Sequence, residues 1–139
     1  MPEPDWLDLE VVLEIHQKLL ARFGGASGLR DRGLLDSALG RPRWQHEFDP
    51  AADVHRFAST YAFGIAKNHP FVDRNKRVAF ECAYAFLRFH GWHITATQAE
   101  VVRVMLALAS GDLSEEQLAA WLRQNSDAAG IPPPTDTSP

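Results

Sequence analysis

Apolar residues recur every three or four positions along most of the chain, with polar residues between them. This spacing places apolar side chains on one face of an α-helix. The pattern predicts four amphipathic helices, over residues 8–23, 53–67, 97–109 and 114–123. Gly24-Gly25 is typical of the end of the first helix. Thr97 is suited to cap the third, and Ser114 with Gln117 forms a capping box that begins the last.

A shorter helical pattern occupies residues 34–39 and is followed by two residues that disfavour a helix. Gly40 gains more freedom outside a helix than other residues do, and Pro42 lacks the N–H that a helix interior requires. These two residues are therefore expected to end the helix, and residues 41–51 to form a loop rich in aromatic and charged side chains.

The segment from residue 75 to residue 89 is apolar almost all round. A helix that is apolar on every face belongs in the middle of a bundle. The expected fold is therefore all-α, with about six helices around this central one and a brief extended stretch at residues 92–95. One domain is expected over residues 1–124. The tail, residues 125–139, is rich in Pro, Ser, Thr and Asp and is expected to be disordered.

Composition narrows the possible functions. The 139 residues suit one domain, and a hydrophobic content of 45% is enough for a compact core. The formal net charge of -4 argues against a general nucleic-acid-binding surface, although it permits a local basic pocket. We therefore expect no direct contact with nucleic acid.

The sequence also indicates a compartment. The first residues lack the basic start and the apolar stretch of a signal peptide, and no apolar run approaches the ~20 residues that span a bilayer. Cys82, the one cysteine, cannot form an internal disulfide and is expected to be a small buried hydrophobe. We expect a soluble cytoplasmic protein that does not bind a membrane.

The densest chemistry lies in residues 69–77, His-Pro-Phe-Val-Asp-Arg-Asn-Lys-Arg, directly before the central helix. The N–H groups at a helix N-terminus are unpaired, and together with the helix dipole they favour an anion. Because an unperturbed imidazole is mostly neutral at pH 7, His69 is the candidate general base for a hydroxyl. Asp73 is the candidate ligand of Mg²⁺, which usually takes one or two carboxylates together with phosphate oxygens.

The end of this segment is suited to the charge of a triphosphate. Asn75 offers an amide donor, Lys76 a point charge, and Arg77 a fork that matches phosphate oxygens. Fixed donors of this kind also hold the charge that develops during transfer, so Arg77 is a candidate catalytic residue beside His69. The segment predicts transfer of a phosphate-containing group to a hydroxyl.

Each of these residues also has a purely structural interpretation. A lone histidine is more often structural than catalytic, Asp73 could be a helix N-cap, and a basic cluster is usually a solvated turn. All of these residue types fall within nine positions between two helices, and this conjunction favours a site.

Residues 69–77 resemble the signature of the Fic/Doc family, which reads His-Pro-Phe-x-Asp/Glu-Gly-Asn-Gly/Lys-Arg, and they are most like its Doc (death-on-curing) branch. A second block, residues 24–42, resembles the upstream part of Doc-like proteins. The resemblance implies a mainly helical Fic fold and nucleotide-dependent modification of a protein hydroxyl. In bacteria it often implies a toxin of a type II toxin-antitoxin pair, silenced by a small Phd-like antitoxin.

By match of position, the resemblance implies that His69 is the base and Asp73 the magnesium ligand. It also implies that the phosphates of ATP are bound by Asn75, Lys76 and Arg77. Fic enzymes that transfer AMP usually have glycine at the position of Lys76. Doc-type toxins have lysine there and transfer a phosphoryl group to a threonine of elongation factor Tu, which inhibits translation. Kinase-like transfer is therefore the favoured function, with AMP transfer or a catalytically inactive binding module as the alternatives.

Two residues depart from the family pattern. Arg74 stands where the family usually has Gly or Ala, and it would either clamp phosphate in the nucleotide site or crowd that site. Glu81 lies one helical turn after Arg77 and is expected to pair with it, which would weaken its hold on phosphate. The inhibitory Ser/Thr-x-x-x-Glu-Gly/Asn motif of many Fic proteins has no match in this chain, which favours a separate inhibitor.

Overall fold

The computed structural model describes residues 2–128, which form six α-helices and two short strands. The elements in chain order are α1 (Leu9–Phe23), α2 (Arg32–Phe48), α3 (Val54–Asn68), α4 (Asn75–Phe89), β1 (Trp92–Ile94), α5 (Gln98–Ser110), α6 (Glu115–Gln124) and β2 (Ser126–Ala128). The predicted all-α fold is confirmed, because the strands form only a small two-stranded sheet.

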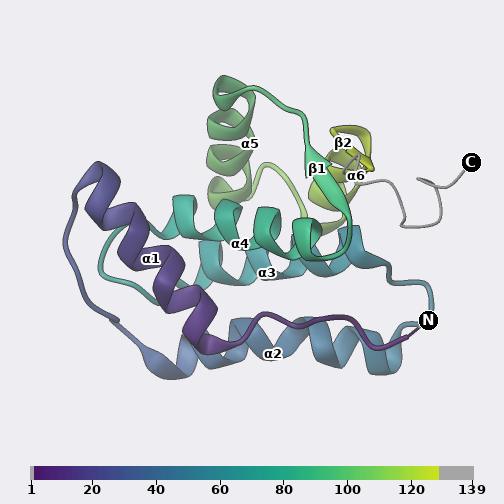
Figure 1. Ribbon diagram of the computed structural model, residues 1–139, viewed down its shortest axis with the longest axis horizontal. Coiled ribbons are helices and arrows are strands. Elements are labelled where there is room, and N and C mark those ends of the chain that lie inside the picture. The colour runs from purple at the N-terminus through teal and green to yellow at the C-terminus, as the bar shows by residue number, and fades with distance from the viewer. Residues whose placement is uncertain (1, 129–139) are drawn as a thin grey trace, which may run out of the picture.

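The centre of the bundle is the antiparallel pair of α3 and α4 (Figure 1). The predicted central helix, residues 75–89, is confirmed with its bounds as α4. It shares the centre with α3, which contacts α2, α4, α5 and α6. Gly64 of α3 allows a close approach of α2, since a Cβ there would lie 3.0 Å from the Cβ of Ala38. Cys82 is buried in the core, as expected.

The predicted end of α2 at Gly40 and Pro42 was wrong, because the helix continues to Phe48. Its buried side chains keep helical spacing through the proline: Leu35, Ala38, Leu39, Pro42 and Gln45. Packing of this stripe on α3 outweighs the hydrogen bond that Pro42 cannot donate. Residues 41–48 are therefore helical rather than part of a loop.

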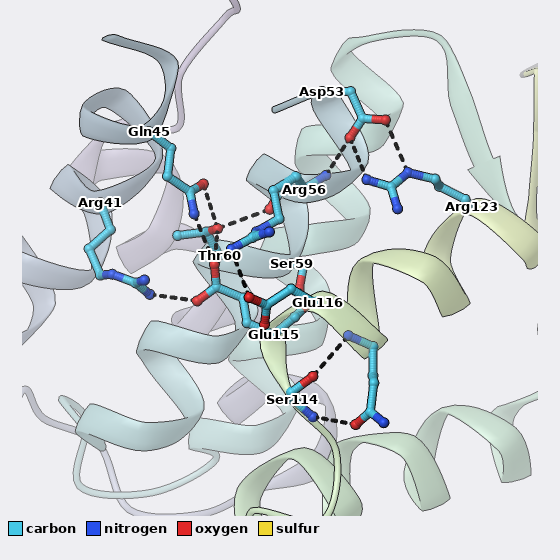
Figure 2. A network of polar contacts seen from close by, with 11 residues as sticks. Arg41, Gln45, Asp53, Arg56, Ser59, Thr60, Ser114, Glu115, Glu116 and Arg123 are labelled. Atoms are coloured by element: carbon cyan, nitrogen blue, oxygen red, sulfur yellow. Dashed lines mark hydrogen bonds and ion pairs between the residues drawn. The ribbon is translucent and has the colours of Figure 1, made fainter. Parts of the chain in front are cut away.

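α6 is joined to α2 and α3 by a buried polar network around Glu115 (Figure 2). The Glu115 side chain is only 7% exposed and pairs with Arg41 of α2 at 2.9 Å and Arg56 of α3 at 3.1 Å. Gln45 and Thr60 also donate hydrogen bonds to its Oε2. A buried carboxylate with this many donors remains charged and links three helices.

The tail was predicted to be disordered from residue 125, which is too early. Residues 126–128 form β2, which pairs antiparallel with β1, and Ser126 is buried, with its Oγ 3.0 Å from Nε2 of His55. The extended stretch expected at residues 92–95 is confirmed as β1, but its partner strand has no hydrophobic pattern to reveal it. The rest of the predicted tail, residues 129–139, lies outside the described residues.

The turn between α3 and α4 lies beside the C-terminal end of α1 and the segment that leads from α1 to α2 (Figure 1). This turn contains the motif of residues 69–77. No helix within residues 2–128 combines the length and the hydropathy needed to cross a membrane.

Candidate active site

The motif begins at the C-terminal end of α3. His69 is the C-cap residue and adopts the left-handed conformation, with φ 48° and ψ 56°. Histidine is among the residues that tolerate this region better than most. The sharp turn leaves His69 exposed to solvent rather than buried in the core. A general base must be accessible in this way to reach the proton of its substrate.

The segment between α1 and α2 forms a backing strip for the motif. The N–H groups of Arg30 and Asp31 both donate to the carbonyl of Pro70, at 2.6 and 3.0 Å. Val72 donates to the carbonyl of Gly28 at 3.0 Å. These bonds hold the two segments antiparallel and restrict the backbone on both sides of Phe71.

Arg30 also contacts the end of α3 through its side chain. Its Nε donates to the carbonyl of His69 at 2.7 Å, and its Nη2 donates to the carbonyl of Asn68 at 2.8 Å. The last carbonyls of a helix have no intrahelical donor, and a cation near them is favourable. Arg30 therefore stabilises the turn that presents His69.

Phe71 anchors the middle of the motif. Its side chain is 1% exposed and stacks on the ring of His16, with centroids 4.1 Å apart. The amide of Asn75 accepts from the N–H of Phe71 and donates to its carbonyl, both at 2.9 Å. The Asn75 side chain thus holds the loop. The group that Asn75 offers to an anion at the start of α4 is therefore its backbone N–H.

Asp73 is held as a carboxylate. The N–H of Ala26 donates to its Oδ2 at 3.1 Å, and the N–H of Arg74 donates to its Oδ1 at 2.8 Å. The hydrogen bond from Ala26, followed by that from Arg74, lowers the pKa of Asp73 below its ordinary value. A Cβ on Gly25 would lie 2.8 Å from Oδ2, so this glycine provides the space in which the carboxylate sits.

The side chain of Arg74 binds the end of α1. Its Nε donates to the carbonyl of Gly24 at 2.9 Å and its Nη2 to that of Phe23 at 2.7 Å. Arg74 adopts the left-handed conformation, with φ 68°, which accounts for glycine at this position in the family pattern. Its guanidinium therefore lies against α1, although the residue still contributes to the wall of the cavity described below.

The N-terminus of α4 has no side-chain cap. The five other helices within residues 2–128 each have one, provided by Asp8, Asp31, Asp53, Thr97 and Ser114. Asp73 is consequently not the N-cap, which was its structural alternative. The first N–H groups of α4 remain available to an anion.

A cavity of about 330 Å³ opens beside this uncapped helix start. One wall is polar and consists of consecutive motif residues, Asp73, Arg74, Asn75, Lys76 and Arg77. The other wall is apolar and consists of Phe80 from α4 with Val101, Val102, Met105 and Leu106 from α5. Five of the six predicted site residues thus share one cavity, while His69 lies outside its lining.

Arg77 lies between α1, α4 and α5. Its Nε is 3.4 Å from Oε2 of Glu81, which confirms the predicted ion pair. Its Nη1 donates to Gln98 at 3.3 Å, and its guanidinium lies 5.2 Å from the centre of the Phe23 ring. Within residues 2–128 the Arg77 Nε is shielded from solvent and makes no hydrogen bond, so the ion pair with Glu81 is the interaction of this atom that the structure shows.

Comparison of the sequence with known proteins identifies its family. The Fic/DOC family profile matches residues 6–87. The chain is 33% identical over 129 residues to Toxin Doc of Mycolicibacterium smegmatis, covering 90% of this chain and 96% of that protein. It is 29% identical over 115 residues to Protein kinase doc of Escherichia phage P1, covering 83% and 90%. The chain therefore belongs to the Fic/Doc family.

Reasoning from the sequence missed the residues that support the motif. Arg30, Gly25 and the N–H of Ala26 hold His69 and Asp73 from a segment about forty residues upstream. Their signal was present in the second block of resemblance, residues 24–42, but the roles within that block were not apparent. His16 is buried, and the contact of its Nε2 with the carbonyl of Asp73 at 3.1 Å gives it a role in holding the loop.

Proposed function

We propose that the protein is a Doc-like toxin of a type II toxin-antitoxin pair that transfers the γ-phosphoryl group of ATP to a hydroxyl of a target protein. By resemblance, the target is a threonine of elongation factor Tu, and the modification inhibits translation in the cytoplasm. The observation that carries this proposal is the uncapped N-terminus of α4, which adjoins a carboxylate, a lysine and an arginine and follows an exposed histidine.

The proposed reaction assigns one step to each group. The imidazole of His69 accepts the proton of the target hydroxyl, whose oxygen forms a bond to the γ-phosphorus as the bond to the β-bridging oxygen breaks. The products are ADP and a phosphorylated hydroxyl, and the proton passes from His69 to solvent. Lys76, Arg77 and the first N–H groups of α4 would hold the phosphate charge.

The site suits one magnesium ion bound together with the nucleotide. Asp73 is a charged carboxylate on the cavity wall, and residues 2–128 contain no cluster of three or more acidic, histidine or cysteine side chains that would form a closed metal site. Mg²⁺ commonly binds one or two carboxylates plus substrate phosphates. Asp73 would hold the ion, which neutralises phosphate charge when bound.

Labelling experiments test the reaction. Purified protein is incubated with elongation factor Tu, Mg²⁺ and ATP labelled at either the α or the γ phosphate. Label from the γ position alone, abolished by His69→Ala with the melting temperature preserved, is expected. Label from the α position would establish AMP transfer instead. No label from either nucleotide would favour the inactive binding module.

A Phd-like antitoxin is the proposed partner. The two Doc relatives support this assignment, because Toxin Doc is named as a toxin and the family signature matches here residue by residue at His69, Asp73, Asn75, Lys76 and Arg77. Expression of the wild-type chain alone is expected to arrest growth, and the His69→Ala chain is expected not to. Continued growth with wild-type protein present in soluble form would contradict the toxin assignment.

A further inference from the structure

The main-chain peptide that joins Asp73 to Arg74 has both of its polar groups engaged. Its N–H donates to Oδ1 of Asp73 at 2.8 Å. Its carbonyl lies 3.1 Å from Nε2 of His16, and since a carbonyl can only accept, the imidazole is the donor. A single buried side chain of α1 therefore holds the oxygen end of the peptide whose nitrogen end holds the candidate magnesium ligand.

This peptide needs to be held because the residue after it is strained. Arg74 has φ 68° and ψ 22°, a conformation that residues other than glycine disfavour. Rotation of the Asp73–Arg74 peptide by half a turn would return φ of Arg74 to the negative region, as the orientation of the central peptide distinguishes a type I from a type II turn. The same rotation would turn the N–H away from the Asp73 carboxylate and the carbonyl away from His16.

We infer that His16 is a positioning residue for magnesium binding, because its hydrogen bond to the Asp73 carbonyl opposes this rotation and keeps the Arg74 N–H on the Asp73 carboxylate. The inference rests on the proposed function and deepens it by adding a residue of α1 to the site. It also explains how this chain keeps the motif geometry with arginine where the family pattern has glycine.

The imidazole of His16 is well fixed for this role. It is 3% exposed, and its ring stacks on that of Phe71, with centroids 4.1 Å apart and planes inclined at 22°. Phe71 is in turn held by two hydrogen bonds with the amide of Asn75. Groups that orient a metal ligand from behind in this way affect metal affinity although they do not touch the metal.

Magnesium titrations of ATP binding, measured by calorimetry on the full chain, test the inference. His16→Phe keeps a ring against Phe71 but removes the donor, so the magnesium concentration for half-maximal ATP binding should rise about fivefold or more. His16→Gln places an amide donor near the position of Nε2 and should restore the wild-type magnesium dependence. Binding of inorganic tripolyphosphate without magnesium should be the same in all three proteins, because it uses the groups at the start of α4.

Two variants of Arg74 test the link with backbone strain. Arg74→Gly removes the strain, so adding His16→Phe in that background should change the magnesium dependence by less than about twofold. Arg74→Ala removes the same guanidinium but keeps the strain, and there His16→Phe should retain its full effect. If His16→Phe does not fold, His16→Asn, which is too short to reach the carbonyl, replaces it in each comparison with His16→Gln.

His55→Phe is the control for a purely structural role. His55 is 5% exposed, lies at the start of α3 rather than at the motif, and contacts Ser126. This variant should lower the melting temperature and leave the magnesium dependence unchanged. Wild-type magnesium dependence in His16→Phe, or an equal effect of that change in the Arg74→Gly background, would overturn the inference. If ATP binding to the wild-type chain does not depend on magnesium, the proposed function itself fails.

Discussion

The side chain of Arg30 donates a hydrogen bond from Nε to the main-chain carbonyl of His69, at 2.7 Å. The two residues are 39 positions apart in the chain, and His69 is one of two non-glycine residues with positive φ among residues 2–128. A left-handed residue at a helix end persists when the surroundings hold it there. The exposed histidine therefore depends on a cation from the neighbouring segment for its orientation.

Replacing Arg30 should impair transfer more than nucleotide binding. Arg30→Ala removes the bonds to the carbonyls of His69 and Asn68, while the phosphate wall on α4 is unchanged. Since small displacements of a catalytic group are costly, we expect the transfer rate to fall about tenfold or more with an unchanged ATP dissociation constant. Arg32→Ala, which removes only an exposed pair with Asp36, is the matched control. Equal loss of binding and rate would contradict this role.

A methyl group at Gly25 should displace the Asp73 carboxylate. Gly25 has φ 121°, and its Cβ would lie 2.8 Å from Oδ2 of Asp73. Gly25→Ala is expected to lower the free energy of unfolding by about 1–2 kcal/mol through backbone strain, and to weaken magnesium-dependent ATP binding. Gly40→Ala is the control, because the added Cβ would have no atom within 4 Å and Gly40 lies in the middle of α2. It should leave stability unchanged or slightly raised, and ATP binding unchanged. A Gly25→Ala protein with wild-type binding would show that Asp73 does not need this space.

Neutralising Glu81 should strengthen phosphate binding. The Glu81 carboxylate lies 3.4 Å from the Arg77 Nε and partly neutralises the positive charge of Arg77. Both side chains are about one quarter exposed. Glu81→Gln keeps the length of the side chain and removes the charge, so we expect the dissociation constants of ATP and tripolyphosphate to fall about two- to threefold, as befits a partly screened pair. Asp36→Asn, in an exposed pair on α2, is the control. A weaker affinity after Glu81→Gln would mean that Glu81 orients Arg77 productively.

Glu115 should make stability depend on acidity. Burial alone would raise its pKa, but the hydrogen bond from Thr60 and the charge of Arg41 outweigh burial and hold the pKa below the ordinary value of 4.5. Because the folded-state pKa is the lower one, this contribution is present above pH 4.5 and is lost as the pH falls through the folded value.

Variants of Glu115 and its neighbour check this contribution. Glu115→Gln is expected to lower the free energy of unfolding at pH 7 by about 2 kcal/mol, with the difference from wild type shrinking in acid. Glu116→Gln alters an exposed pair with Arg56 at 3.6 Å and should change stability by less than about 0.5 kcal/mol. Denaturant melts at pH 7 and pH 3.5 measure both. A difference that persists in acid would show that shape rather than charge is responsible.

Helix positions could be predicted where the signals are local. The bounds of α4, the cap at Thr97 and the capping box at Ser114 follow from neighbouring residues, and the structure confirms them. The prediction was wrong at Pro42 and at residues 126–128, where partners distant in the chain decide the conformation. Packing on α3 keeps α2 helical, and pairing with β1 orders a segment whose own composition favours disorder.

The sequence by itself determined a helical protein with a Fic/Doc motif between two helices, the second of them central, because helical periodicity, capping and a contiguous motif are all encoded within a few residues. Only the tertiary structure decided how the motif is held. In the structure the Arg74 side chain binds the end of α1, Arg30 donates to the carbonyl of His69, and the N–H of Ala26 donates to the carboxylate of Asp73. The motif also shares a cavity with apolar side chains of α5. Each of these contacts joins residues more than twenty positions apart, and such pairings depend on how whole helices pack, which no local pattern specifies.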